Sequence, residues 1–143
     1  MTGSLAGGTV VIALTVLIHT FGLILITHGM AKLVTTFRMH GQRSRVAAMI
    51  SVVLGLFGVL TLEIWLWAAC YRLFGLIPDF ATALYFSTVT FSTIGYGDVV
   101  PAPGWRMFAA LEGINGFLLI GWSTAYLISA GTRIGPFRTG EHF

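Results

Sequence analysis

The residues of this chain that could do chemistry lie in one short segment, residues 93–98, with the sequence Thr-Ile-Gly-Tyr-Gly-Asp. Glycine at two alternate positions allows backbone angles that are closed to other residues. A strand with this alternation can point successive carbonyl oxygens to one side, and a row of such oxygens can replace the water shell of a dehydrated cation. Non-helical backbone of this kind is tolerated within a membrane only where protein buries it or where it lines a wet cavity.

The composition indicates that the elements around this segment lie in a lipid bilayer. Hydrophobic residues make up 56% of the 143 residues and charged residues only 9%, whereas a soluble domain carries roughly a quarter charged residues. The length corresponds to one small domain. The net charge of +3 is attributed to Lys and Arg beside lipid headgroups, and no nucleic-acid partner is expected.

Three apolar stretches each reach the roughly 20 residues that a helix needs to cross the hydrocarbon core. They run from about Thr9 to Ala31, from about Val46 to Tyr71 and from about Trp105 to Thr132. A fourth stretch, Phe80 to Phe91, is too short to span and predicts a re-entrant helix, which Asp79 can cap. The sequence therefore predicts an all-α membrane protein with three transmembrane helices and one re-entrant helix.

Basic residues are distributed unequally between the two ends of these helices. Six flank the first loop or follow the third helix and only two lie on the other side. By the positive-inside rule, the N-terminus is outside, and the loop Thr35–Ser44 and the C-terminus are cytoplasmic. The six are Lys32, Arg38, Arg43, Arg45, Arg133 and Arg138, and the two are Arg72 and Arg106. Because no basic residue precedes the first stretch, a retained helix is favoured over a cleaved signal peptide.

The order of long helix, short helix, glycine-rich strand and long helix resembles the pore of the potassium channel family over about residues 46–132. Four copies of the strand build one filter in this family, so the resemblance implies a homotetramer. It implies a pore domain (46–134), and the apolar stretches and basic residues outside this domain predict an N-terminal unit (residues 1–45, a transmembrane helix and a basic cytoplasmic loop) and a short cytoplasmic tail (135–143). Within the pore domain, the outer helix, pore helix, filter and inner helix would cover residues 46–72, 80–91, 93–98 and 105–132.

The same resemblance assigns roles to the filter residues. Gly97 would permit the turn at the outer mouth, and the Tyr96 side chain would point away from the axis. Potassium ions, rather than a covalent cofactor, would occupy the filter. Their ligands would be the hydroxyl of Thr93 and the backbone carbonyl oxygens of Thr93, Ile94, Gly95 and Tyr96.

The aspartate after the filter has two possible roles. Asp98 would form a ring that concentrates cations at the outer mouth, or it would only hold the filter to the pore helix. Many members of the family have a tryptophan that bonds this aspartate, but Phe86 stands there and cannot donate, although Tyr85 could substitute. Val89 stands where some members have a pore-helix carboxylate.

The third helix carries candidates for a gate. Gly116 best matches the position at which inner helices of the family bend, although close packing of this glycine, flanked by Gly113 and Gly121, is an equally supported interpretation. Four residues below it recur at a spacing that puts them roughly on one face, as expected of a cavity wall, with Ile128 as the constriction. They are Ile120, Thr124, Ile128 and Thr132.

Two acids inside the apolar stretches, Glu63 and Glu112, are candidates for function because ionisable groups are costly in a membrane. His19 falls at a depth similar to that of Glu63, so a contact between them would attach the first helix to the pore. Alternatively, Glu112 bonds the back of the pore helix. A structural role of these groups is favoured over proton sensing.

The sequence therefore predicts passive, potassium-selective conduction in a prokaryotic inner or plasma membrane. No nucleophile–base pair supports an enzyme. The alternatives are a less selective cation channel and a non-conducting accessory subunit or scaffold that retains the pore fold. Besides three further copies, the expected partners are membrane lipids, which are anionic if the basic loop from Lys32 to Arg45 does more than set the topology.

Overall fold

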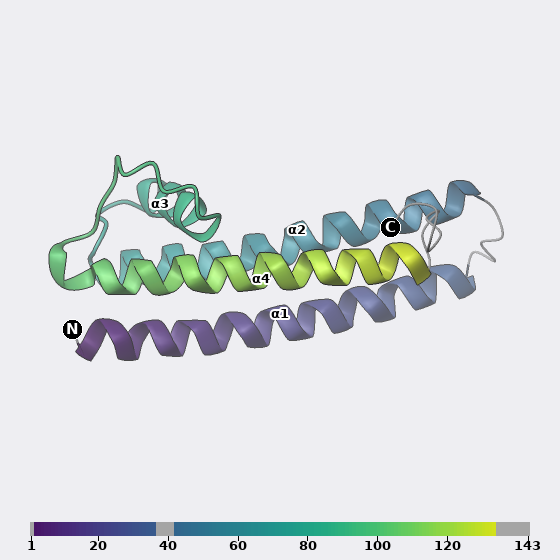
Figure 1. The fold of residues 1–143 in the computed structure, drawn as a ribbon, viewed down its shortest axis with the longest axis horizontal. Helices are drawn as coiled ribbons and strands as arrows, with labels where there is room; N and C mark the ends of the chain where they lie inside the picture. Colours follow the sequence, from purple (N-terminus) through teal and green to yellow (C-terminus); the bar gives the residue numbers. More distant parts are fainter. Residues whose placement is uncertain (1, 37–41, 134–143) are drawn as a thin grey trace.

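The computed structural model describes residues 2–36 and 42–133, and this part of the chain is helical apart from its turns and the segment after the short helix (Figure 1). Three helices have the length and hydropathy of membrane spans, namely Thr2–Lys32, Ser44–Leu73 and Pro103–Arg133. The predicted all-α membrane protein with three spanning helices is thus confirmed. The elements are α1 (Thr2–Thr36), α2 (Gln42–Leu73), α3 (Phe80–Phe91), η1 (Pro103–Trp105) and α4 (Arg106–Arg133).

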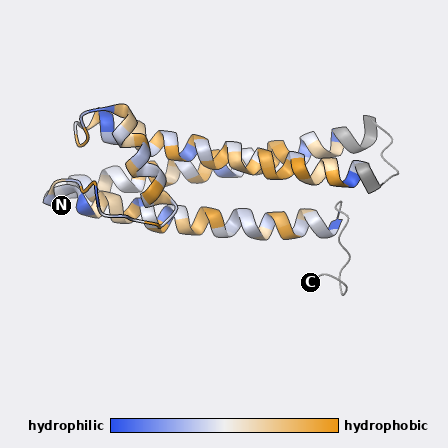
Figure 2. Ribbon diagram, turned by 90° about the horizontal axis from the view of Figure 1, so that it is seen from above, coloured by the Kyte–Doolittle hydropathy of each residue, from blue (hydrophilic) through white to orange (hydrophobic). Residues whose placement is uncertain are grey.

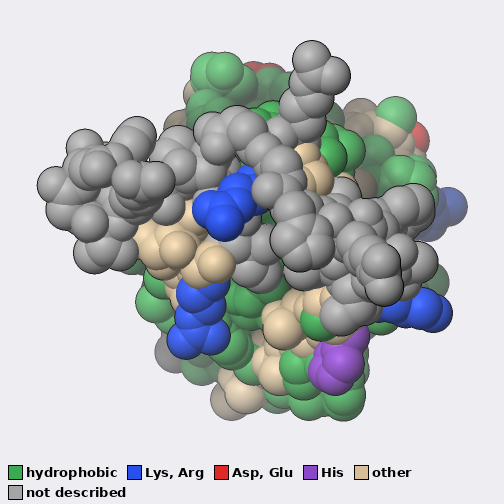
Figure 3. Space-filling view, turned by 90° about the vertical axis from the view of Figure 1, so that its right-hand side faces the viewer, with side chains coloured by type: hydrophobic (Ala, Val, Ile, Leu, Met, Phe, Trp, Pro, Cys, Tyr) green, Lys and Arg blue, Asp and Glu red, His purple; other side chains and the backbone are tan. Residues whose placement is uncertain are grey.

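The three long helices lie side by side, and α3 packs on α2 and α4 at one end of them. The N-terminus of α1 and the segment that follows α3 share that end, whereas the last turns of α1 and α4 and the first turn of α2 lie at the opposite end (Figure 1). Hydrophobic residues cover most of the length of the long helices (Figure 2). The end far from α3 carries Lys and Arg side chains on its surface (Figure 3). Lys32, Arg45 and Arg133 are exposed and lie near the end of α1, the start of α2 and the end of α4.

Two helices are longer than the apolar stretches that predicted them. Helix α1 begins at Thr2 and ends at Thr36, and α2 begins at Gln42, so the expected boundary at residue 45 lies inside α2 and the expected loop Thr35–Ser44 is too long. The physical reason is that a helix bonds its own backbone and can therefore continue past the hydrocarbon core, whereas hydropathy marks only the part in lipid. The expected tail, 135–143, lies outside the described residues.

The short helix occupies the twelve residues of the expected re-entrant helix, Phe80–Phe91. The Asp79 carboxylate accepts a hydrogen bond from the backbone N–H of Thr82 at 2.8 Å, which satisfies one free donor of the first turn. This backbone hydrogen bond lowers the pKa of Asp79. The capped start fixes where α3 begins and hence where the segment 93–98 emerges at its other end.

Helix α1 is closely packed against the other two long helices. A Cβ atom on Gly8 would meet the side chain of Leu111 on α4, and a Cβ atom on Gly22 would meet that of Val59 on α2. Small residues at such positions let the backbones of membrane helices approach closely. The first helix is therefore part of the packed unit.

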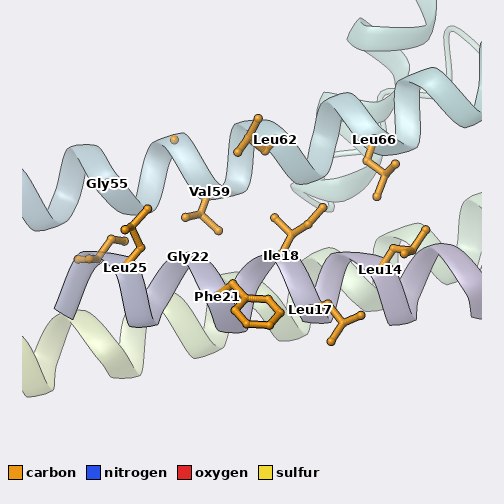
Figure 4. A pocket seen from close by; sticks show the side chains of 12 residues that line it. Leu14, Leu17, Ile18, Phe21, Gly22, Leu25, Gly55, Val59, Leu62 and Leu66 are labelled. Carbon is orange, nitrogen blue, oxygen red and sulfur yellow. The ribbon is translucent and has the colours of Figure 1, made fainter. Parts of the chain in front are cut away.

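A groove of about 860 Å³ runs between α1 and α2 on one side of this unit (Figure 4). Its walls contain no polar side chain, so it offers hydrocarbon contacts and no ligand for an ion. The lining residues are Leu14, Leu17, Ile18, Phe21, Gly22, Leu25, Ile26, Gly55, Gly58, Val59, Leu62 and Leu66.

Candidate ion-conduction site

The segment after α3 has an alternating backbone. Three alternate residues have positive φ angles, which are 62° at Thr93, 56° at Gly95 and 76° at Gly97. The two residues between them, Ile94 and Tyr96, do not have a positive φ. Alternation between left-handed and ordinary backbone angles turns successive peptide groups so that their carbonyl oxygens can face one side. The Gly95 N–H also donates to the carbonyl oxygen of Val89 at 2.9 Å, which ties the segment to α3.

The positive φ of Thr93 is a feature that the sequence did not reveal. A β-branched residue in the left-handed region is a genuine outlier, with a cost of about 1–3 kcal/mol, and such strain clusters at functional sites. The glycines signalled the alternation, but no residue pattern marks a threonine that shares it. The surrounding contacts must hold Thr93 in this conformation, including the bond from its N–H to the carbonyl oxygen of Thr90 at 3.0 Å.

The carbonyl oxygens of this segment have no partner in the described part of the chain. None of residues 93–97 accepts a hydrogen bond there, and all are exposed, including Ile94 at 57% and Tyr96 at 69%. Within a membrane, unpaired backbone groups must line a wet cavity or be covered by other protein. The described part of a single chain leaves this segment uncovered.

Asp98 is held by the short helix α3. The Tyr85 hydroxyl of α3 donates to Asp98 Oδ2 at 2.7 Å, and the Val99 N–H donates to Oδ1 at 3.1 Å. The bond to Asp98 raises the pKa of Tyr85, so this hydroxyl remains a donor at neutral pH. Tyr85 thus supplies the hydrogen bond that Phe86, which is buried, cannot give.

Glu112 on α4 is fully buried behind α3. The Tyr71 hydroxyl of α2 donates to Glu112 Oε2 at 2.6 Å, and Ser87 Oγ of α3 lies 2.5 Å from Glu112 Oε1. Ser87 Oγ also lies 2.9 Å from the carbonyl oxygen of Ile64 on α2. Glu112 therefore bonds the back of the short helix, as one of the sequence hypotheses proposed, and it joins three elements.

His19 and Glu63 are in contact, as the other hypothesis proposed. His19 Nδ1 lies 2.9 Å from Glu63 Oε1, both side chains are fully buried, and the His19 ring packs at 5.1 Å on Trp122 of α4. Sequence reasoning missed a second bond, in which Asn115 Nδ2 of α4 donates to Thr15 Oγ1 of α1 at 2.9 Å. An amide in a membrane helix is a signal that could have found it, because such groups bond across helices.

Comparison with known proteins agrees with this geometry. Residues 59–133, just over half of the chain, match the profile of a family described as "Ion channel". The chain belongs to this family. A protein of Rhodopseudomonas palustris described as "Putative potassium channel protein" is 44% identical over 62 residues, which are 43% of this chain and 14% of that protein. The match thus covers a small part of that relative, and no protein of solved structure matches the channel.

Gly116 of the channel lies against the end of α3. It is buried, and a Cβ atom there would overlap the backbone carbonyl of Phe91, the last residue of α3. A Cβ atom on Gly113, one turn earlier, would be in ordinary contact with the Thr90 carbonyl, whereas one on Gly121 would meet no neighbour within 4 Å among the described residues. Close packing at Gly116 is therefore present, and α4 runs through this position without a break. A hinge at Gly116 stays a prediction.

The four residues expected on a cavity wall do not share one environment in the single chain. Ile120 and Thr124 line a groove together with residues of α2, whereas Ile128 is 47% exposed and Thr132 is half-buried. The cause is that a spacing of four residues drifts around a helix of 3.6 residues per turn. The hydroxyls of Thr124 and Thr132 bond the backbone of α4 itself. A role of these residues in the channel's cavity or gate remains a prediction.

Proposed function

We propose that four copies of this channel form one potassium-selective pore. The observation that carries the proposal is the alternating backbone at residues 93, 95 and 97, which lies next to carbonyl oxygens without a partner in the described chain. Four such strands around an axis would surround an ion with carbonyl oxygens in place of its water shell. The same arrangement would give each strand the protein cover that a membrane demands.

Two further features support the choice of a cation. The C-terminal end of α3 carries roughly half a negative charge, because its last carbonyl groups point the same way, and this end leads directly into residue 93. Asp98 adds an acidic group after the strand, and Tyr85 holds it in place. The description of the Rhodopseudomonas relative as a potassium channel protein favours potassium over other cations.

The proposed orientation has the N-terminus and the filter outside and the C-terminal end of α4 in the cytoplasm of a prokaryotic cell. Lys32, Arg45 and Arg133 support it, because they lie near the ends of α1, α2 and α4 that are far from α3 (Figure 1) and basic residues favour the cytoplasmic side. Because basic side chains attract anionic headgroups at the cytoplasmic surface, these residues would also bind anionic lipid at that end.

The test is potassium flux into liposomes that contain the purified protein. Wild type should conduct, and Gly95→Ala should lose its flux while it remains expressed and oligomeric. Within the described residues of one chain, a Cβ atom on Gly95 would meet nothing within 4 Å, but its φ of 56° costs an alanine about 1–2 kcal/mol in each copy. The matched control is Gly75→Ala, which has a φ of 68° and equally open space but lies before α3.

Equal flux through wild type and Gly95→Ala would contradict the filter assignment. A reversal potential that does not distinguish potassium from sodium would instead favour a less selective cation channel. A purified wild-type protein with the mass of four chains and no flux would favour the non-conducting accessory subunit.

A further inference from the structure

We infer that Glu112 is a positioning residue for the filter and that it acts as a neutral carboxylic acid, bonded at once to the outer helix and to the short helix α3. The inference rests on the proposed function, because it concerns how the proposed filter is held. It follows from the hydrogen-bond pattern around this carboxyl group.

The pattern is decided by the number of hydrogens on Ser87. A hydroxyl group has one hydrogen to donate, and a backbone carbonyl can only accept. Ser87 Oγ is within bonding distance of two oxygens, the Ile64 carbonyl at 2.9 Å and Glu112 Oε1 at 2.5 Å. Ser87 can donate to only one of the two; we assign its hydrogen to the Ile64 carbonyl, and a protonated Glu112 then supplies the hydrogen of the second bond. The other oxygen of Glu112 then accepts from the Tyr71 hydroxyl at 2.6 Å.

The surroundings of Glu112 favour the same protonation state. The side chain has no exposed surface, and within the described residues it forms no ion pair, in contrast to Glu63, which faces His19. An unpaired carboxylate is costly in an apolar interior, whereas a neutral acid with two bonds is not. Both oxygens of Glu112 are hydrogen-bonded, so a neutral Glu112 leaves neither carboxyl oxygen without a hydrogen-bond partner.

The link to the filter passes through α3. Ser87 lies two residues before Val89, whose carbonyl oxygen accepts the hydrogen bond from the N–H of Gly95 at 2.9 Å. A shift of Ser87 would move Val89 on the same short helix and with it the anchor of the strand. Glu112 therefore fixes the distance between the strand and the two long helices behind it, which sets the width available to an ion.

The experiment compares wild type, Glu112→Gln and Glu112→Ala in liposomes, with the permeability ratio of potassium to sodium as the readout. Glutamine ends in an NH₂ group that donates and a carbonyl oxygen that accepts, so it can form both bonds of a neutral acid and should keep the wild-type ratio. Alanine removes both bonds and should lower the ratio roughly tenfold, the factor that about 1.4 kcal/mol gives. A Glu112→Ala channel with the wild-type ratio, or a Glu112→Gln channel with the lowered ratio, would overturn the inference.

Two measurements keep the inference testable if Glu112→Ala does not fold. Ser87→Ala removes only the hydroxyl on α3 and should lower the permeability ratio in the same direction; an unchanged ratio counts against the positioning role. The infrared spectrum of wild type should contain a protonated-carboxyl band that is missing in Glu112→Gln, and absence of that difference would overturn the neutral form. A wild type without flux would reject the proposed function, while the infrared result would still decide the protonation of Glu112.

Discussion

At the scale of single residues, the hydrogen bond from Tyr85 to Asp98 takes the place of the tryptophan–aspartate bond that many members of the potassium channel family have and that Phe86 cannot form. Tyr85 precedes Phe86, the position at which the family's donor was expected, and its hydroxyl reaches Asp98 Oδ2 at 2.7 Å. One residue of displacement along a helix rotates a side chain by about 100°, since the helix has 3.6 residues per turn. The longer reach of a tyrosine toward the exposed side of α3 makes the bond possible.

Tyr85→Phe should reduce the potassium current and let the filter inactivate, because Asp98 loses its donor from α3 while the ring is kept. Tyr85→Trp restores an N–H donor and should recover most of the current. Single-channel recording in planar bilayers gives the open probability of each variant. If the phenylalanine variant behaves as wild type does, the bond does not hold the filter.

Gly116 is the second residue with a specific consequence. Gly116→Ala should destabilise the fold by about 1–3 kcal/mol, the usual cost of forcing a methyl group into a packed site, because the Cβ atom would overlap the carbonyl of Phe91. Gly121→Ala is the matched control, since its Cβ atom would meet nothing within 4 Å in the part of the chain that the structure describes. Thermal unfolding in detergent compares the two.

A stable Gly116→Ala protein with altered gating would favour the hinge over the packing interpretation. Equal stability of the alanine variants at both glycines would show that α3 can move away from α4 at little cost. The close contact between Gly116 and the carbonyl of Phe91 would then not explain why residue 116 is a glycine.

At the scale of elements, α1 is attached to α2 and α4 by buried polar bonds in addition to apolar packing. The stripe of α1 that faces α2 and α4 contains Thr15 and His19, one turn apart, and each side chain bonds a different helix. Mutual attraction of apolar surfaces is weak within lipid, so packing of small residues and hydrogen bonds between helices decide how they associate. The two bonds therefore fix both the position and the rotation of α1.

His19→Leu should destabilise the packing of α1 by about 1–3 kcal/mol, because it leaves the fully buried Glu63 without its hydrogen-bond partner. The double variant His19→Leu with Glu63→Leu should be close to wild type, because two apolar side chains can replace a buried pair at little cost. Chemical denaturation in detergent micelles measures both. If the double variant is as unstable as the single variant, the loss of stability does not come from leaving Glu63 without its partner, and the prediction is wrong.

At the scale of the whole molecule, the distribution of charge predicts how the chain lies in the membrane. We expect Ala102→Cys, between the filter segment and η1, to react from outside the cell, and Arg133→Cys, at the last residue of α4, to be protected. Both are made in a Cys70→Ala background, since Cys70 is the only cysteine. The measurement is labelling of intact cells by a membrane-impermeant maleimide. The reverse labelling pattern would contradict the proposed orientation.

Much of the architecture could be read from the sequence. The hydropathy of three long stretches and one short stretch identified the helices, because the bilayer core imposes a length that composition alone reveals. The two glycines predicted an unusual backbone, since few other residues adopt positive φ angles. The acids stood out for a similar reason, as any ionisable group in an apolar stretch needs a partner.

Only the tertiary structure decided which partners these groups have. Glu63 and Glu112 are both acids in apolar helices, yet one faces a histidine of α1 and the other a tyrosine and a serine of α2 and α3. The rotation of each helix decides this, and that rotation depends on packing at sites such as Gly22 and Gly116 rather than on the local pattern. The strained Thr93 is likewise a product of its surroundings, because a threonine left to its own preference avoids that conformation.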